Sequence, residues 1–305
     1  MLNSFQSVFK ADLFKGKAIV ITGGGSGIGR CTAHELASLG ADLALVGRKL
    51  EKLETVRDEI LKTCAVKVSI HSCDIREEDK VAATVADILK EHGKIDHLIN
   101  NAGGQFPAPL CTINAKGWET VVRNNLTGGF LMAREVYNQH MASNLGKTDM
   151  SITNIIADMW NGMPGMGHSG AARAGMLNFS ETASLEWAPV RVNAVAPGFI
   201  ASSGMDTYPE PMKQTIMQLD KTIPLQRLGL EAEVSGVLTF LCSPAASFIS
   251  GSCIRIDGAA PNAKRVWPMV GNGQQNPAFN SFHLGGLPEV IRRRDADRDA
   301  KKAAK

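Results

Sequence analysis

Short apolar runs alternate with longer amphipathic segments along most of the chain. The apolar runs have the length of strands and lie at residues 18–22, 42–46, 66–72, 97–100, 150–157, 191–196 and 253–257. Between them, apolar residues recur with the spacing of a helix, for example in 27–39, 77–92 and 118–141. The alternation predicts an α/β fold, in which a doubly wound parallel sheet carries helices on both faces.

A glycine-rich segment follows the first predicted strand. Residues Thr22 to Gly29 read TGGGSGIG and join the strand to a predicted helix. Glycines at such a junction allow a tight turn, and the helix start offers N–H groups to a phosphate. Alone, the pattern also fits an ordinary turn. We interpret it as the dinucleotide site of a single Rossmann-type domain, with the binding residues Gly23, Gly25, Ser26, Gly27, Ile28 and Gly29.

The end of the second predicted strand indicates which dinucleotide binds. Gly47 stands where an Asp or Glu would receive the ribose hydroxyls, and Arg48 and Lys49 follow it. A guanidinium fork suits a 2′-phosphate, so we predict NADP(H) rather than NAD(H). In the alternative interpretation, Arg48 and Lys49 only begin a solvated helix and Glu51 serves the ribose. Glu51 is expected inside that helix, which disfavours the alternative.

Further cofactor residues are predicted after the third and fourth strands. Asp74, followed by Ile75, is expected to accept a hydrogen bond from the adenine amino group. The short residues Asn101, Ala102 and Gly103 leave room for backbone to lie along the cofactor. As isolated residues, all of these would be ordinary turn formers.

Charge and composition bound the domain organisation. The formal net charge is +3, but residues 259–305 hold nine Lys/Arg against four Asp/Glu, a surplus of five that leaves 1–258 at minus two. No nucleic-acid partner is therefore predicted. We divide the chain into an N-terminal arm (1–13), the cofactor-binding domain (14–258) and a C-terminal extension (259–305). The charged end of the extension is expected to be a solvated helical or disordered tail.

Cysteine, histidine and hydropathy patterns indicate a cytoplasmic protein. The six cysteines include no CxxC pair and the seven histidines show no ligand spacing, so neither a disulfide framework nor a metal site is predicted. The N-terminus lacks the pattern of a secretory signal. Residues 234–254 carry no charge, yet Pro244 divides them into a helix, a loop and a strand start rather than a membrane span.

Five motifs occur in a characteristic order. They are TGGGSGIG at 22–29, CDI at 73–75, NNAGG at 100–104, NNLTG at 124–128 and VAPG at 195–198. Together they resemble the short-chain dehydrogenase/reductase family over residues 14–260. The resemblance implies a nicotinamide-dependent oxidoreductase, commonly a homotetramer, with a seven-stranded sheet in the order 3-2-1-4-5-6-7. It also implies that Asn125 supports a proton-relay water and that the nicotinamide end is held by Pro197, Gly198 and Ile200.

The catalytic positions depart from that family's pattern. Most members place a Ser after the fifth strand and Tyr-x-x-x-Lys at the start of the next helix. Both tyrosines of this chain are instead followed at the fourth position by methionine, Met141 and Met212. Alignment on SLEW at 184–187 puts Ser169 at the Tyr position and Arg173 at the Lys position. The catalytic candidates are Asn125, Asp158, His168, Ser169 and Arg173.

This departure changes the predicted reaction. Ser169 is too weak an acid to replace tyrosine and Arg173 stays charged. Hydride addition to a conjugated double bond needs only hydrogen-bond donors at the carbonyl oxygen. Ser169 and His168 are the predicted donors, and Asn125 or the indole N–H of Trp160 could also serve. The segments at 104–106, 168–175 and 243–249 also resemble peroxisomal trans-2-enoyl-CoA reductase, and Ser-x-x-x-basic resembles the 2,4-dienoyl-CoA reductases. We therefore predict NADPH-dependent reduction of the double bond of an enoyl thioester or enone, a small hydrophobic or acyl-thioester substrate.

Two other functions fit the same residues. An alcohol or carbonyl oxidoreductase on a hydrophobic, terpenoid-like substrate would use His168 as acid/base, because imidazole ordinarily titrates near neutral pH. His168 is otherwise a helix-capping or loop residue, and Asp158 either orients His168 or a water, or caps a turn. The third function is NADPH binding without catalysis.

Two segments are expected to contact the substrate. Met159, Trp160, Met163 and Met166 lie between glycines and a proline, which favours a loop that forms a flexible apolar wall. Residues 198–228, rich in prolines and methionines, are expected to be a mobile lid that orders over bound cofactor.

Overall fold

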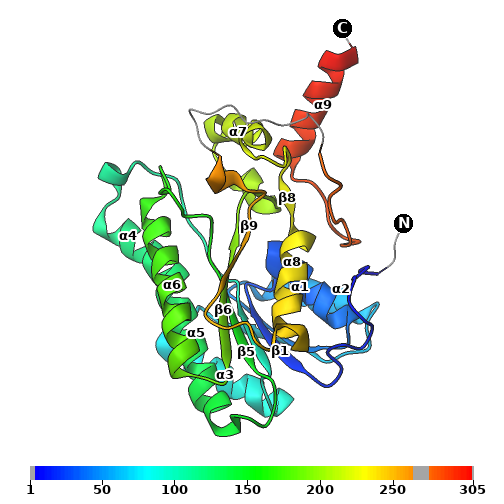
Figure 1. Ribbon diagram of the computed structural model, residues 1–305, viewed down its shortest axis with the longest axis vertical. Helices are drawn as coiled ribbons and strands as arrows, with labels where there is room; N and C mark the ends of the chain where they lie inside the picture. Colours follow the sequence, from blue (N-terminus) through cyan, green and yellow to red (C-terminus); the bar gives the residue numbers. More distant parts are fainter. Residues whose placement is uncertain (1–3, 264–274, 304–305) are drawn as a thin grey trace.

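A parallel sheet of seven strands forms the centre of the molecule (Figure 1). The computed structural model describes residues 4–263 and 275–303. The strands are β1 (Ala18–Thr22), β2 (Asp42–Gly47), β3 (Val68–Ser72), β4 (His97–Asn100), β5 (Ser151–Ile155), β6 (Arg191–Pro197) and β9 (Cys253–Ile256). They are ordered β3-β2-β1-β4-β5-β6-β9, with every neighbouring pair parallel. Numbered within this sheet, the order is 3-2-1-4-5-6-7, which confirms the predicted fold.

Helices cover both faces of the sheet. One face carries α1 (Gly27–Ser38), α2 (Leu50–Leu61) and α8 (Glu231–Cys242), and the other carries α3 (Glu78–His92), α5 (Gly128–Gln139) and α6 (Gly167–Glu186). Strand β2 shows how each face obtains its core: Leu43 and Leu45 belong to one apolar cluster, and Ala44 and Val46 to the other. Successive side chains of a strand point to opposite faces, so a strand covered on both sides is apolar over most of its length.

The segment predicted as one helix over 118–141 is divided. Helix α4 (Ala115–Val122) passes into a π turn at Arg123–Thr127 and then into α5. Gly128 begins α5 where an added Cβ would lie 2.7 Å from the Ile75 side chain, so the helix packs closely there. π turns occur frequently at functional sites, and this one carries Asn125.

The lid segment and the C-terminal extension form a smaller structured region. Strands β7 (Ile200–Ala201) and β8 (Gly229–Leu230) make a separate two-stranded sheet, which the sequence did not predict. Between them lie α7 (Glu210–Ile216) and 3-10 turns at Ser203–Thr207 and Leu219–Thr222. Helix α9 (Glu289–Ala303) stands beside α7 in Figure 1. The charged end of the extension, expected to be a solvated helical or disordered tail, is helical, and Val290 and Ile291 directly before it are buried.

The remaining short elements connect the larger ones. They are 3-10 turns at Leu110–Thr112, Met141–Asn144, Pro244–Ala246 and Ala260–Asn262. The uncharged stretch 234–254 consists of most of α8, a loop and the start of β9, as predicted. Among the helices described here, none is both long and apolar enough to cross a membrane.

Candidate active site

The turn between β1 and α1 adopts a shape that side chains would obstruct. Gly23 has φ of +68°, and its N–H donates to the Val46 carbonyl at 2.7 Å. A Cβ on Gly29 would lie 2.4 Å from the Gly23 carbonyl oxygen. The Ser26 side chain makes no capping hydrogen bond within the described residues. It therefore leaves the first N–H groups of α1 open to an anion.

This turn is joined to the end of β4. The Thr22 hydroxyl oxygen accepts from the N–H groups of Asn101 at 3.0 Å and Ala102 at 2.9 Å. The Asn101 amide in turn donates to the Thr22 carbonyl at 2.9 Å. Strand β1 lies between β2 and β4, where the strand order reverses. Open α/β sheets bind their ligands at this switch point.

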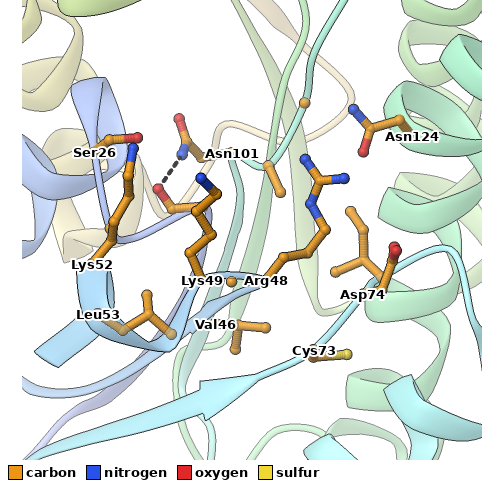
Figure 2. Close-up of a pocket in the computed structure, with 16 residues that line it drawn as sticks. Ser26, Val46, Arg48, Lys49, Lys52, Leu53, Cys73, Asp74, Asn101 and Asn124 are labelled. Carbon is orange, nitrogen blue, oxygen red and sulfur yellow. Dashed lines mark hydrogen bonds between the residues drawn. The ribbon is translucent and has the colours of Figure 1, made fainter.

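A cleft with a cavity volume of about 290 Å³ opens beside the turn (Figure 2). The predicted cofactor residues that line it are Gly23, Gly25, Ser26, Arg48, Lys49, Asp74, Ile75, Asn101, Ala102 and Gly103. The predicted residues Gly27, Ile28 and Gly29 form the first turn of α1. Sequence reasoning missed Lys52, which extends along the cleft with Arg48 and Lys49 (Figure 2). Its spacing of four residues from Arg48, one turn of a helix, was the available signal.

Asp74 lies on the opposite side of the cleft and is held by an ion pair. The Arg76 Nε donates to Asp74 Oδ1 at 2.8 Å. This hydrogen bond is the main reason that the pKa of Asp74 falls to about 2. The carboxylate is therefore charged at neutral pH and can accept a hydrogen bond.

The predicted nicotinamide motif lies at the ends of β6 and β9. Gly198 donates to the Ile256 carbonyl at 2.9 Å, and a Cβ on Gly198 would lie 2.8 Å from the Cα of Asp257. Pro197 ends β6, and its carbonyl accepts from the Asp158 N–H at 3.0 Å. Ile200 follows in β7. The close approach of backbones therefore requires a glycine at position 198.

Arg173 and Asn125 converge on the loop after β4. A Cβ on Gly103 would lie 2.6 Å from Arg173 Nη2 and 2.7 Å from Asn125 Oδ1. The Asn125 amide is bonded on both sides to the backbone of Gly104, at 3.0 and 2.7 Å. The structure therefore brings together two of the five catalytic candidates at the edge of the cofactor cleft.

The Arg173 guanidinium is a buried cation. Its side chain is 9% exposed, and Nη1 donates to the Ile155 carbonyl at 2.6 Å. In the described part of the chain, Nε has no hydrogen-bond partner and no carboxylate pairs with the guanidinium. Burial lowers the pKa of Arg173 to about 10, so the group stays charged at neutral pH. Buried charges are normally paired, and this one offers N–H donors to a ligand.

Ser169 is fully buried and bonded to Gln105. The Ser169 hydroxyl donates to Gln105 Oε1 at 2.5 Å, and Gln105 itself is exposed. Sequence reasoning assigned no role to Gln105. Its position directly after the NNAGG motif was the signal that could have identified it.

The other two candidates, His168 and Asp158, do not contact each other. His168 Nδ1 accepts from the Ser169 N–H at 3.0 Å, and the ring packs edge-on against Phe106 with centroids 4.6 Å apart. Its Nε2 is buried without a hydrogen-bond partner in the described residues. Burial first, and then the charge of Asp257, raise the pKa of Asp158. No hydrogen bond joins Asp158 to His168 within residues 4–263.

The predicted substrate wall is a loop, as expected. Asn161, Gly162 and Gly165 have positive φ values, and Asn161 donates to the Pro261 carbonyl at 3.2 Å. The Arg255 guanidinium lies over the Trp160 ring, with its central carbon 5.0 Å from the ring centroid. The chain after β9 therefore holds this loop in place.

The fold and the cleft define a nicotinamide-dependent oxidoreductase. Residues 23–259 match the family model described as enoyl-(acyl carrier protein) reductase. The chain belongs to the short-chain dehydrogenase/reductase family.

Individual relatives differ in their reactions. The chain is 33% identical to a probable 2,4-dienoyl-CoA reductase of Bacillus subtilis (strain 168), over 79% of this chain and 95% of the relative. It is 34% identical to a glucose 1-dehydrogenase of Gluconobacter oxydans (strain 621H), over 81% and 92%. A solved citronellol catabolism dehydrogenase of Pseudomonas aeruginosa PAO1 is 57% identical, with a TM-score of 0.75 over 84% of this chain and all of that chain.

Proposed function

We propose that the protein is an NADPH-dependent reductase of the conjugated double bond in a hydrophobic enoyl thioester or enone. The observation that carries the proposal is the group of side chains at the start of α6, which we call the catalytic corner: Ser169, Arg173, Asn125 and Gln105. There Ser169 and Arg173 stand in the places of Tyr and Lys, and hydrogen-bond donors replace a titrating acid. The similarity to a probable 2,4-dienoyl-CoA reductase supports the same reaction class.

The preference for NADPH rests on three cations. Arg48, Lys49 and Lys52 line the cleft at the β2–α2 corner, and Gly47 leaves no carboxylate there for a ribose diol. Glu51, the alternative ribose ligand, lies inside α2 as expected. A 2′-phosphate would therefore meet complementary charge.

Each residue of the corner has one task in this proposal. NADPH held in the cleft would supply a hydride for the β carbon of the substrate, and the α carbon would take a proton from water. Arg173 would hold the nicotinamide ribose, and Asn125 would keep the loop at Gly104 in place. Gln105 has amide N–H donors for the substrate carbonyl oxygen, where negative charge develops. Ser169 has a single proton, which Gln105 accepts here, so it orients that amide.

The test is NADPH consumption by purified protein given a medium-chain trans-2-enoyl-CoA, with NADH and a matching ketone in parallel. Turnover on the enoyl thioester with NADPH is expected. Ser169→Ala should reduce it, and Ser184→Ala on the same helix should not, because within the described residues that hydroxyl bonds only to the Glu181 carbonyl. Turnover on the ketone alone would contradict the proposal. NADPH binding without any turnover would indicate a binding protein instead.

A second candidate is oxidation or reduction at a terpenoid-like alcohol or carbonyl. It is favoured by the 57% identity to the citronellol catabolism dehydrogenase and by the unpartnered Nε2 of His168. Citronellol with NADP⁺ is the substrate to try. In this case His168→Ala should abolish turnover at every pH, whereas under conjugate reduction it should cause only a modest loss.

We also propose a cytoplasmic homotetramer. The six cysteines are all free, which suits a reducing compartment such as the cytoplasm.

The proposed tetramer is supported by exposed apolar side chains. Phe248 and Leu185 are strongly exposed, as expected of side chains that a neighbouring subunit covers. Light scattering of the purified protein tests the oligomeric state.

A further inference from the structure

The lid (residues 198–228) and α9 share one apolar core. Met205, Ile216 and Ile223 of the lid are buried in a cluster with Val290 and Ile291, which are 3% and 1% exposed. These residues belong to none of the clusters that fill the two faces of the main sheet. The lid therefore depends on the first turn of α9 to complete its interior.

A lid carboxylate also caps α9. The two oxygens of Asp206 accept from the N–H groups of Glu289 and Val290, each at 3.0 Å. The first N–H groups of a helix have no partner within the helix, and a capping carboxylate also suits the positive end of the helix dipole. The start of α9 is thus fixed by a residue 83 positions earlier in the chain.

An ion-pair cluster joins the lid to the middle of α9. The Asp220 side chain is 6% exposed, and its oxygens meet Arg298 Nη2 at 3.1 Å and Arg294 Nη1 at 3.4 Å. Burial opposes ionisation of Asp220, but the two guanidinium groups outweigh it, and the pKa is lowered. A buried carboxylate left without these partners would be costly.

The extension is fixed to the domain as well. Phe282 packs against Phe5 of the N-terminal arm, at 5.8 Å between ring centroids, and lies under the Arg30 guanidinium. The Phe279 N–H faces Glu233 of α8 at 3.4 Å. The extension therefore contacts the domain at one end and the lid at the other.

We propose that α9 is a latch that holds the lid in its position over the active site. It is thus a positioning element for substrate binding, with Asp220 and Arg298 as its main polar contact. The inference rests on the lid role that we assign to residues 198–228. It deepens the proposed function, because loss of the latch should weaken substrate binding more than it slows the chemical step.

Hydrogen exchange of the full-length, cofactor-free protein tests the latch. Arg298→Glu should speed exchange in peptides covering 203–223 at least about tenfold, with β1 and β4 unchanged. Arg298→Lys keeps the charge and should preserve most of the protection. Arg292→Glu changes the charge of the same helix by the same amount at an exposed position, and should have no effect. Val290→Asp tests the apolar half of the contact independently.

Unchanged lid exchange in both Arg298→Glu and Val290→Asp would overturn the proposal. The measurement needs no substrate, so it decides the role of α9 even if the proposed reaction is wrong. Where turnover is found, Arg298→Glu should raise KM by a larger factor than it lowers kcat. An equal effect of Arg292→Glu on KM would contradict a specific latch.

Discussion

The two sides of the site depend on different constraints. On the cofactor side, at the ends of β1, β2 and β4, the residue types follow the family pattern because the backbone leaves no space for others, as at Gly29. On the catalytic side, Ser169 and Arg173, which we propose to stand in the places of the family's Tyr and Lys, are both buried and bonded. The difference teaches that nucleotide binding fixes backbone shape, whereas the groups around the reacting atoms change with the reaction.

The strongest test of the cofactor side is Gly29→Ala. The added Cβ would lie 2.4 Å from the Gly23 carbonyl oxygen, and backbone cannot move aside cheaply. We expect a loss of stability of more than about 3 kcal/mol together with loss of NADPH binding. Thermal unfolding and fluorescence titration with NADPH measure both. Gly236→Ala in α8, where a Cβ meets nothing within 4 Å, should be tolerated.

The catalytic side is tested by Arg173→Met. The change leaves the Ile155 carbonyl without its donor and removes the buried cation, so kcat/KM should fall about 100-fold or more. Arg173→Lys keeps a charge and should recover part of the activity. Steady-state kinetics measures the loss of turnover, and calorimetric titration with NADPH measures any loss of cofactor binding. Near-normal activity of Arg173→Met would show that the cation has no role in the reaction.

A smaller effect is expected for Arg48→Gln. Hydrogen bonds to charged groups contribute about 1.5–3 kcal/mol, so KM for NADPH should rise about tenfold to a hundredfold while KM for NADH stays constant. Arg57→Gln in α2, the helix that follows Arg48, is the control, because Arg57 pairs only with exposed Asp58 in the described residues. Equal changes for both cofactors would contradict a 2′-phosphate contact.

The smallest effect concerns two glutamates at the start of α8. Burial raises the pKa of Glu231 to about 7, more than the charge of Arg30 lowers it. As pH rises from 4.5 to 7, the unfolded chain releases this proton first, so the folded state loses stability. Glu231→Gln should therefore stabilise by about 1–3 kcal/mol at pH 8 and have no effect at pH 4.

The neighbouring Glu233 is the matched control for this comparison. It pairs with Arg227 at 2.7 Å and accepts from the Leu230 N–H at 2.8 Å. Glu233→Gln should consequently destabilise the protein at pH 8, the opposite sign. Urea unfolding at the two pH values measures both variants, and the same sign for both would contradict the argument.

The sheet could be predicted because its causes are local. Buried parallel strands are apolar over most of their length, so runs such as 18–22 and 42–46 are visible in the sequence, and the glycine motif shows which strand lies at the switch point. The π turn at 123–127 could not be found in this way, since the apolar spacing of a single helix continues through it.

The contacts of the catalytic corner and of α9 needed the structure. Ser169 meets Gln105 across 64 positions, and Asp206 caps a helix 83 positions away. No local pattern encodes such pairs. The tail RRRDADRDA has the composition of a solvated segment, and the two apolar residues just before it, at 290–291, were too few to indicate a buried face.

The hydrogen bond between Ser169 and Gln105 bears on how this enzyme could evolve. Introducing the family's common tyrosine and lysine at positions 169 and 173 would change only two residues. The phenol ring at position 169 would, however, enter a site with no exposed surface. Gln105 and the neighbouring Phe106, which packs on His168, would have to move first. Under the proposed function, exchanging only these two residues should therefore yield a damaged protein rather than an alcohol dehydrogenase.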